Sequence, residues 1–161
     1  MPRRTQLVIV IATVTASLAL VLGSTPLGLG SLNMLHGQIT PADSLLGVFE
    51  GRTPCGRIAT EFTGFPSSNC EKVKWRLTLY RDAATGKPTS YRYEGTRTTR
   101  LGRWRMVSEG GRIVYHLTPS GPGAALSLLS VDDRVLLLLD STGQVLVGDA
   151  SWSYALNRAD R

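Results

Sequence analysis

The chain has 161 residues, of which 42% are hydrophobic and 19% are charged, and its formal net charge is +6. This length suits one domain with an appended segment and excludes two full-sized domains, while the hydrophobic fraction is ordinary for a chain that buries a core. The 17 Gly and 8 Pro residues predict many turns.

The N-terminal segment predicts export from the cytoplasm. Arg3 and Arg4 precede an uncharged apolar run over residues 7–23, and no formally charged residue follows until Asp43. The run is long for a signal peptide and short of the about 20 apolar residues that span a bilayer. Cleavage after Gly23 and retention as an anchor therefore both remain open. The positive-inside bias keeps the arginines in the cytoplasm, so we expect a periplasmic domain, either anchored in the inner membrane or soluble after cleavage.

Three parts are expected along the chain. Residues 1–30 form the signal anchor or signal peptide, residues 31–45 form a linker, and residues 46–158 form a β-rich domain. A short helical turn is expected in the linker, because Thr40 can cap a helix start, Pro41 suits the first helical position and Asp43 lies near the positive end of the helix dipole.

Beyond residue 46, apolar and polar residues alternate in short runs, which is typical of half-buried antiparallel strands. The clearest runs are "VKWRLTLY", "SYRYEG", "GRWRMV", "RIVYHLT" and "SWSYALN". Turn-forming segments such as "DAATGKP", "SEGG", "PSGPG" and "DSTGQ" separate them. We count about eight or nine strands joined by short loops, which predicts a mainly β protein with an antiparallel meander closing into a small barrel.

One run, "DRVLLLLD", is apolar on both faces. It predicts either a central strand covered on both sides or a strand that faces a partner.

Several motifs resemble the amino-terminal domain of the NlpE family of copper-resistance and envelope-stress lipoproteins. "GVFEGRTPC" followed by "CEKVKWRLTLYRD" is similar to the family's first strand, its second cysteine and the strand after it, through Gly47, Phe49, Gly51, Pro54, Cys55, Cys70, Val73, Leu77 and Leu79. Two later segments also resemble the family, through Gly102, Trp104, Gly111, Ile113, Leu136, Leu139, Asp140, Gly143 and Leu146. The resemblance implies a small antiparallel, lipocalin-like barrel.

The chain departs from the family in two places. The family spaces its cysteines as C-x-x-C, a motif proposed to bind metal, whereas "GRIATEFTGFPSSN" separates them here. The family is also lipidated on a cysteine where this chain has Ser24. Any anchor must therefore be the hydrophobic helix itself.

The two cysteines admit three interpretations. A disulfide between Cys55 and Cys70 is favoured, because an exported chain meets an oxidising compartment and each cysteine borders a predicted strand. Closing a loop of about 16 residues stabilises a fold by about 3 kcal/mol in the chain-entropy treatment. A copper site using Cys55, Cys70 and His116 is a weaker candidate, because no histidine or methionine lies at a diagnostic spacing from a cysteine. A reactive thiol is the third interpretation.

The sequence carries no motif of a known catalytic site. It lacks a G-x-S-x-G elbow, an H-E-x-x-H motif and a glycine-rich phosphate loop. We therefore expect no enzymatic activity and no resident cofactor, with copper as the one candidate. His116 alternates with Ile113, Tyr115 and Leu117, so its side chain is expected to face solvent.

Basic residues gather in the middle of the chain, with eleven Lys or Arg from Lys72 to Arg112 against three acidic residues. Four arginines near aromatic residues are candidates for an anionic-surface site: Arg97, Arg100, Arg103 and Arg105. In an exported protein the ligand would be anionic lipid or an acidic protein surface, not nucleic acid. A solvated outer face of the barrel is the competing interpretation.

By resemblance, the expected function is non-enzymatic, in envelope stress sensing or copper tolerance. Two alternatives remain. One is a membrane-anchored accessory subunit that docks on a larger membrane complex through its basic face or the apolar run. The other is a lipocalin-like carrier of a small apolar ligand.

Overall fold

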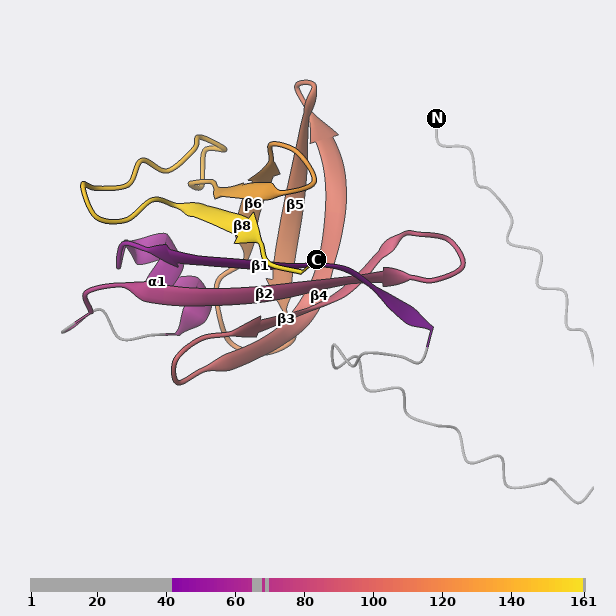
Figure 1. Ribbon diagram of the computed structural model, residues 1–161, viewed down its shortest axis with the longest axis horizontal. Coiled ribbons are helices and arrows are strands. Elements are labelled where there is room, and N and C mark those ends of the chain that lie inside the picture. The colour runs from indigo at the N-terminus through magenta and orange to yellow at the C-terminus, as the bar shows by residue number, and fades with distance from the viewer. Residues whose placement is uncertain (1–41, 65–67, 69, 161) are drawn as a thin grey trace, which may run out of the picture. The chain divides into compact units, whose positions relative to one another are not determined.

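Residues 42–64, 68 and 70–160, which the computed structural model describes, form a closed antiparallel barrel of eight strands with one short helix (Figure 1). The strands follow one another around the barrel in chain order. The predicted meander and its closure into a small barrel are therefore confirmed. The predicted hydrophobic helix over residues 1–30 lies outside the described residues. In the described part of the chain, no helix is long and apolar enough to cross a membrane.

The strands have these bounds: β1 (Asp43–Thr53), β2 (Val73–Asp82), β3 (Pro88–Glu94), β4 (Thr99–Glu109), β5 (Arg112–Pro119), β6 (Leu126–Ser130), β7 (Val135–Leu138) and β8 (Ala155–Arg158). Apolar and polar side chains alternate along the strands, and the apolar ones form a core inside the barrel. In β2, Val73, Trp75 and Leu77 are buried, whereas Lys74 and Arg76 are exposed. Successive strand residues point to opposite faces, so the apolar set lines the interior and the charged set lies outside.

The boundary between linker and barrel was predicted wrongly. β1 begins at Asp43, so residues 43–45, which were assigned to the linker, belong to a strand and not to a helical turn. Each residue of this segment instead faces the end of β2, in register pairs from Asp43↔Asp82 to Leu45↔Tyr80. Ladder pairing with a neighbouring strand outweighs the local capping pattern, because the pattern offers only one turn of helix. Thr40 and Pro41 lie outside the described residues.

The two C-terminal strands are shorter than the sequence predicts. β8 begins at Ala155, so Trp152 lies in the preceding loop rather than in a strand. The Asp149 side chain accepts hydrogen bonds from the backbone N–H groups of Ser151 and Trp152, both at 2.8 Å. Such a side-chain turn competes with ladder formation, so this segment turns where alternation predicted a strand.

One helix, α1 (Arg57–Thr63), lies between the cysteines, where the sequence predicted only a loop. It places Ala59 and Phe62 in the core, both with 0% of their surface exposed. The helix ends at Gly64, which has φ 69° and donates its N–H to the carbonyl of Thr60 at 2.8 Å. Glycine adopts this left-handed conformation without strain, and the bond satisfies one of the last helical carbonyls. The i, i+4 spacing of Ile58 and Phe62 was the signal of this helix in the sequence.

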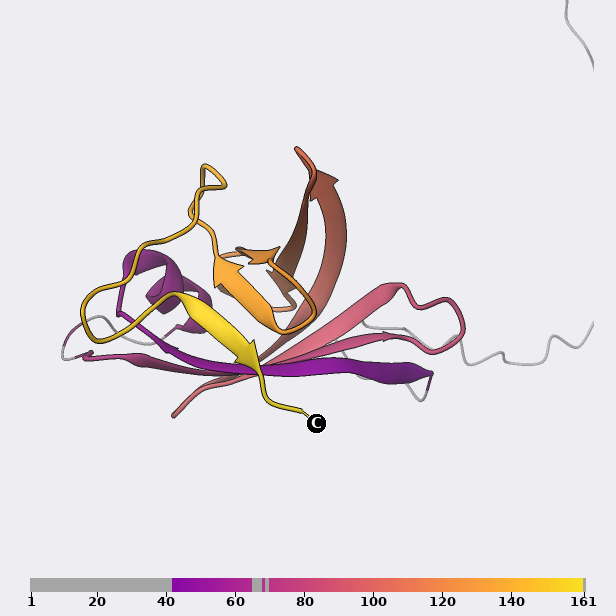
Figure 2. The same cartoon turned by 45° about the horizontal axis from the view of Figure 1, so that its top comes forward.

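The helix closes one end of the barrel (Figure 2). The Phe62 ring stacks on Trp75 with centroids 5.6 Å apart, and it also contacts Tyr91 at 6.0 Å and Tyr93 at 5.8 Å. Aromatic pairs in these geometries contribute about 0.5–1.5 kcal/mol each beyond the burial of their area. The interior at this end is therefore filled by the protein's own side chains.

Burial changes the acid–base behaviour of the two tyrosines in this aromatic cluster. Desolvation raises the pKa of Tyr93 to about 12, and burial also raises the pKa of Tyr91. The Tyr93 hydroxyl donates to the backbone carbonyl of Lys74 at 3.1 Å. The neutral phenol is thus the form that the folded barrel accommodates.

The Phe62 ring plugs the end of the barrel that α1 closes. Replacing Phe62 with Ala should remove this plug and destabilise the barrel by about 3–5 kcal/mol, because a fully buried aromatic ring is lost. Urea unfolding of both proteins measures the change. The matched control is Arg57→Ala on the same helix, whose side chain is exposed and pairs with Glu61 at 3.5 Å. This variant should cost about 0.5 kcal/mol or less. Equal losses for the two variants would contradict the assignment of Phe62 to the core.

The raised pKa of Tyr93 predicts a loss of stability at alkaline pH. Below pH 10 this phenol is neutral in both the folded and the unfolded chain, so its contribution is complete. Between pH 10 and about pH 12 the unfolded chain ionises first, and the stability falls. Tyr93→Phe should flatten this decline in urea-unfolding midpoints relative to the wild type. A decline of the same slope in the variant and the wild type would argue against Tyr93 as the titrating group.

Candidate functional site

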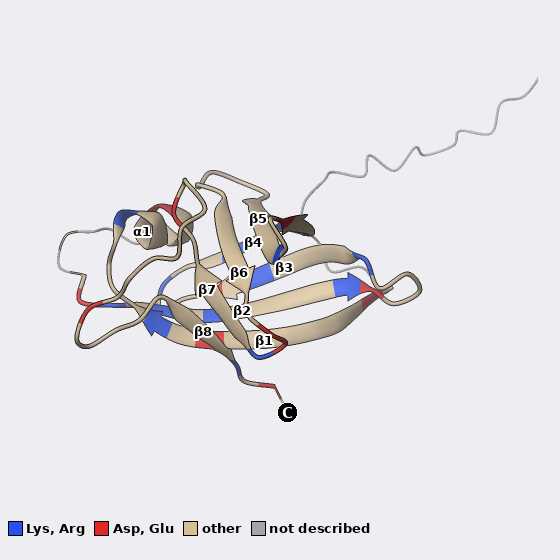
Figure 3. Ribbon diagram, turned by 90° about the horizontal axis from the view of Figure 1, so that it is seen from above, with Lys and Arg blue, Asp and Glu red and all other residues tan. Residues whose placement is uncertain are grey.

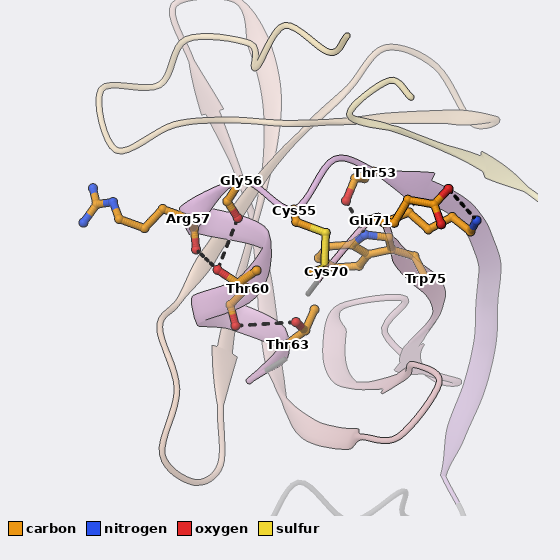
Figure 4. The surroundings of a disulfide bond; sticks show 10 residues. Thr53, Cys55, Gly56, Arg57, Thr60, Thr63, Cys70, Glu71 and Trp75 are labelled. Atoms are coloured by element: carbon orange, nitrogen blue, oxygen red, sulfur yellow. Dashed lines mark hydrogen bonds and ion pairs between the residues drawn. A yellow bond between two sulfur atoms is a disulfide. The ribbon is translucent and has the colours of Figure 1, made fainter. Parts of the chain in front are cut away.

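The two cysteines form a disulfide that joins the chain after β1 to the chain before β2. The Cα atoms of Cys55 and Cys70 are 5.9 Å apart, and the residues are 15 positions apart in sequence. The bridge lies beside α1, near Thr53 and Trp75 (Figure 4), where Trp75 Nε1 donates to Thr53 Oγ1 at 2.9 Å. The predicted disulfide is confirmed. It leaves neither sulfur as a thiolate, so the weaker copper candidate loses both of its soft ligands.

His116 lies on the outer face, as the alternation predicted, but it is half-buried and tied to two side chains. Its Nδ1 lies 2.9 Å from Ser127 Oγ, and its Nε2 lies 3.0 Å from Glu109 Oε1. It therefore links β4, β5 and β6 on the outside of the barrel. Among the described residues, no group of three or more His, Cys, Asp or Glu side chains is placed to hold a metal ion.

The chain of Ser127, His116 and Glu109 has the hydrogen-bond order of a nucleophile, a base and an orienting acid. Its surroundings do not suit catalysis. Ser127 lies within β6 and pairs with His116 in the β5–β6 ladder, so neighbouring backbone N–H groups are used in the sheet instead of forming an oxyanion hole. The groove described below does not include these residues. We interpret the cluster as a cross-strand link.

The four arginines predicted to share an anionic-surface site do not share one face. Arg103 and Arg105 are exposed and alternate with the buried Trp104, so they lie together on the outside of β4. Arg100 is half-buried on the other face of the strand, and its guanidinium donates to the carbonyl of Pro122. Arg97 lies in the loop between β3 and β4. The structure brings together only the pair Arg103 and Arg105.

The apolar run "VLLLL" is covered, not presented as an apolar face. Leu136, Leu138 and Leu139 are buried, with at most 3% of their surface exposed. The chain after β7 folds back on it, through a bridge between Leu139 and Val145 and a hydrogen bond from Leu146 N to Leu138 O at 3.0 Å. This run is therefore a strand within the sheet, and its use as a docking strand loses support.

A groove of about 840 Å³ lies on the outer surface beside β1, β2 and β8. Its walls are charged and polar, and they come from Glu50, Gly51, Arg52, Lys74, Trp75, Arg76, Glu94, Gly95, Thr96, Ser151, Trp152, Ser153, Ala155 and Asn157. Gly51 makes the shape possible, because a Cβ at this position would lie 2.6 Å from the carbonyl oxygen of Ala155. The absent side chain lets β8 approach β1 closely.

Residues that face one another across neighbouring strands form rows in the groove. The charges are balanced in one row and unbalanced in the next. Across the ladder, Glu50 faces Arg76 and Arg76 faces Glu94, and these side chains form ion pairs. Two residues further along, Arg52 faces Lys74 directly. Both are exposed, and neither side chain makes an ion pair or hydrogen bond with any described residue. Lys and Arg are seen where β1 ends and β2 begins (Figure 3).

Trp152, from the loop before β8, also lines the groove. The turn held by Asp149 fixes it, and Lys72 Nζ lies 4.9 Å from the centroid of its ring. Gly148 is required in this turn, because a Cβ there would lie 2.1 Å from the carbonyl oxygen of Trp152. The indole is half-buried, so one part of it remains accessible from the groove.

The sequence analysis noted a basic region but did not identify Arg52 or Trp152 as site residues. Arg52 and Lys74 are 22 positions apart, and only the pairing of β1 with β2 sets them opposite each other. The sequence pattern assigned Trp152 to a strand, on the same face as Tyr154 and Leu156. The "GDASW" segment carried the missed signal, because Gly followed by Asp favours a turn.

Comparisons with protein-family models, with curated proteins and with solved structures gave no significant match to this chain. The resemblance to the NlpE family therefore rests on the quoted motifs alone and stays a prediction.

The disulfide predicts how thiol labelling and stability respond to its loss. In protein from its native compartment, thiol reagents should label neither Cys55 nor Cys70 after denaturation unless a reductant is added first. The double variant Cys55→Ala/Cys70→Ala should be less stable by about 3 kcal/mol, because the unfolded chain regains the entropy of a closed loop. Two labelled cysteines without reductant would contradict the bridge.

Proposed function

We propose that this protein is a non-enzymatic binding module of the bacterial cell envelope. The hydrophobic N-terminal segment holds it at the inner membrane, and the barrel acts in the periplasm through its outer surface. It serves as an accessory component that docks on a larger membrane assembly through the basic part of this surface. The supporting observation is the uncompensated pair of Arg52 and Lys74 in a surface groove.

The rest of the barrel supports binding on the outside over binding within. The aromatic cluster around Phe62 fills the end of the interior that α1 closes. The leucines of β6, β7 and β8 fill much of the remainder, namely Leu126, Leu128, Leu136, Leu138 and Leu156, all with at most 2% of their surface exposed. An apolar ligand inside the barrel would have to displace these side chains, so the carrier alternative loses support.

The disulfide supports the envelope location, because such bonds persist in oxidising compartments and are rare in the cytosol. The charge distribution of the N-terminal segment supports the proposed orientation.

Envelope stress sensing is the second candidate, and the position of the disulfide favours it. The bridge spans the segment that carries α1, and α1 supplies the Phe62 plug. Loss of the bridge in a damaged envelope would loosen the plug and change the exposed surface. Copper binding through the two cysteines is not part of this proposal, since both sulfurs are bonded to each other.

The anchor and the docking function can be tested together on the full-length protein. It should fractionate with membranes, resist extraction by salt and co-purify with a membrane complex in mild detergent. The mass of the mature protein reports whether residues 1–23 are retained. A soluble periplasmic form beginning near Ser24 would overturn the anchor. A protein purified alone in mild detergent would overturn docking, and a deletion strain sensitive to envelope stress would then favour the second candidate.

A further inference from the structure

We propose that the groove beside β1, β2 and β8 binds a compact phosphorylated polyol, such as a sugar phosphate or the phosphate-bearing headgroup of a lipid. Arg52 and Lys74 hold the phosphate, and Trp152 and its neighbours contact the polyol. This assignment deepens the proposed function, because it names a ligand for the outer surface.

The pairing of Arg52 with Lys74 is the main reason for placing an anion here. Like charges directly opposite each other on an antiparallel ladder destabilise the sheet. The neighbouring row shows that this surface can balance its charges, since Arg76 pairs with both Glu50 and Glu94. A dianionic phosphate between Arg52 and Lys74 removes the repulsion and gains charge-assisted hydrogen bonds from both side chains.

The acidic residues next to the cationic pair set the size of the ligand. Glu50 and Glu94 line the same groove. They would repel a long acidic peptide laid across the strands. A single phosphate group at Arg52 and Lys74 avoids them. The groove volume of about 840 Å³ also lies within the range of small-molecule sites.

The remaining walls suit hydroxyl groups. Ser151, Ser153 and Asn157 are exposed and line the groove, and Thr96 lies on the side of β3. Hydroxyl and amide side chains both donate and accept hydrogen bonds, as the hydroxyls of a polyol require. The accessible part of the Trp152 ring offers an apolar surface for the carbon skeleton.

The wall that carries Trp152 is already fixed without a ligand. Asp149 N donates to Trp152 O at 2.9 Å, and the Asp149 carboxylate accepts two backbone N–H groups of the same turn. The ring also lies 4.9 Å from Lys72 Nζ. A wall fixed in advance lowers the ordering entropy that binding would otherwise cost.

Tryptophan fluorescence of the full-length protein in mild detergent provides the test. Of the three tryptophans, Trp75 and Trp104 are buried and Trp152 is half-exposed in the groove. Titration with glucose 1-phosphate should give a saturable change that is lost in Trp152→Phe. Glucose should give none at the same concentrations, and added salt should weaken the response.

Charge variants separate the groove from the general basic character of the protein. Arg52→Ala/Lys74→Ala should weaken glucose 1-phosphate binding by about tenfold for each cation removed. The matched control is Arg103→Ala/Arg105→Ala, which removes two exposed arginines from the outside of β4 and changes the net charge equally. It should bind as the wild type does, and circular dichroism should show all variants folded.

Vesicles distinguish the source of the phosphate. The protein's affinity for phosphatidylcholine vesicles that contain phosphatidic acid is compared with its affinity for glucose 1-phosphate. If the vesicles bind more tightly, and this binding is lost in Arg52→Ala/Lys74→Ala, the groove is assigned to a lipid headgroup. If glucose 1-phosphate binds more tightly, the groove is assigned to a soluble sugar phosphate.

Three results would overturn the proposal: no saturable response to either phosphate probe, equal losses in the two double variants, or tighter binding of poly-glutamate through Arg52 and Lys74. A complex that co-purifies with the wild type while neither phosphate probe binds would leave the docking function in place while the groove assignment fails.

Discussion

Closure of the barrel between β1 and β8 is the contact on which the rest of this structure depends. The ladder itself has only two register pairs, Phe49↔Arg158 and Glu50↔Asn157. The residues after it extend the closure, because Ala159 N donates to Val48 O at 2.8 Å and Asp160 Oδ1 accepts from Val48 N at 2.9 Å. Arg158 adds a hydrogen bond to the carbonyl of Leu46 at 2.7 Å. Side chains thus satisfy backbone groups that a longer strand would have paired.

This closure produces both the interior and the groove. A closed sheet has no free edges, and its two faces become an inside and an outside. The inside is completed by α1 and its phenylalanine, and the disulfide holds the connecting segment that carries them. On the outside, β8 and the turn before it are brought next to β1, which sets Trp152 beside a cationic pair from two other strands. The core and the groove are two faces of the same strands.

This arrangement decides which reactive and charged side chains are used in structural contacts and which remain exposed. The cysteines, which the sequence left open to three interpretations, are used in a covalent link. His116 is used in a cross-strand link, and the aromatic residues of β2 and β3 are used in the core. The charged side chains of the outer face remain. Some are balanced by neighbours of opposite sign, such as Arg76 between Glu50 and Glu94, whereas Arg52 and Lys74 face each other directly across the ladder, which stability does not explain.

The sequence by itself determined the strands with strong alternation, because a period of two directly encodes which side chains face the core. "VKWRLTLY" predicted β2 and its buried face in this way, and the composition around the cysteines predicted their bridge. Tertiary structure decided what local patterns cannot encode. The β1–β2 ladder overrode a capping pattern at Asp43, a buried site for Phe62 stabilised a helix of only seven residues, and register set Arg52 opposite Lys74. Each of these outcomes depends on partners far away in the sequence, and only the closed barrel brings those partners together.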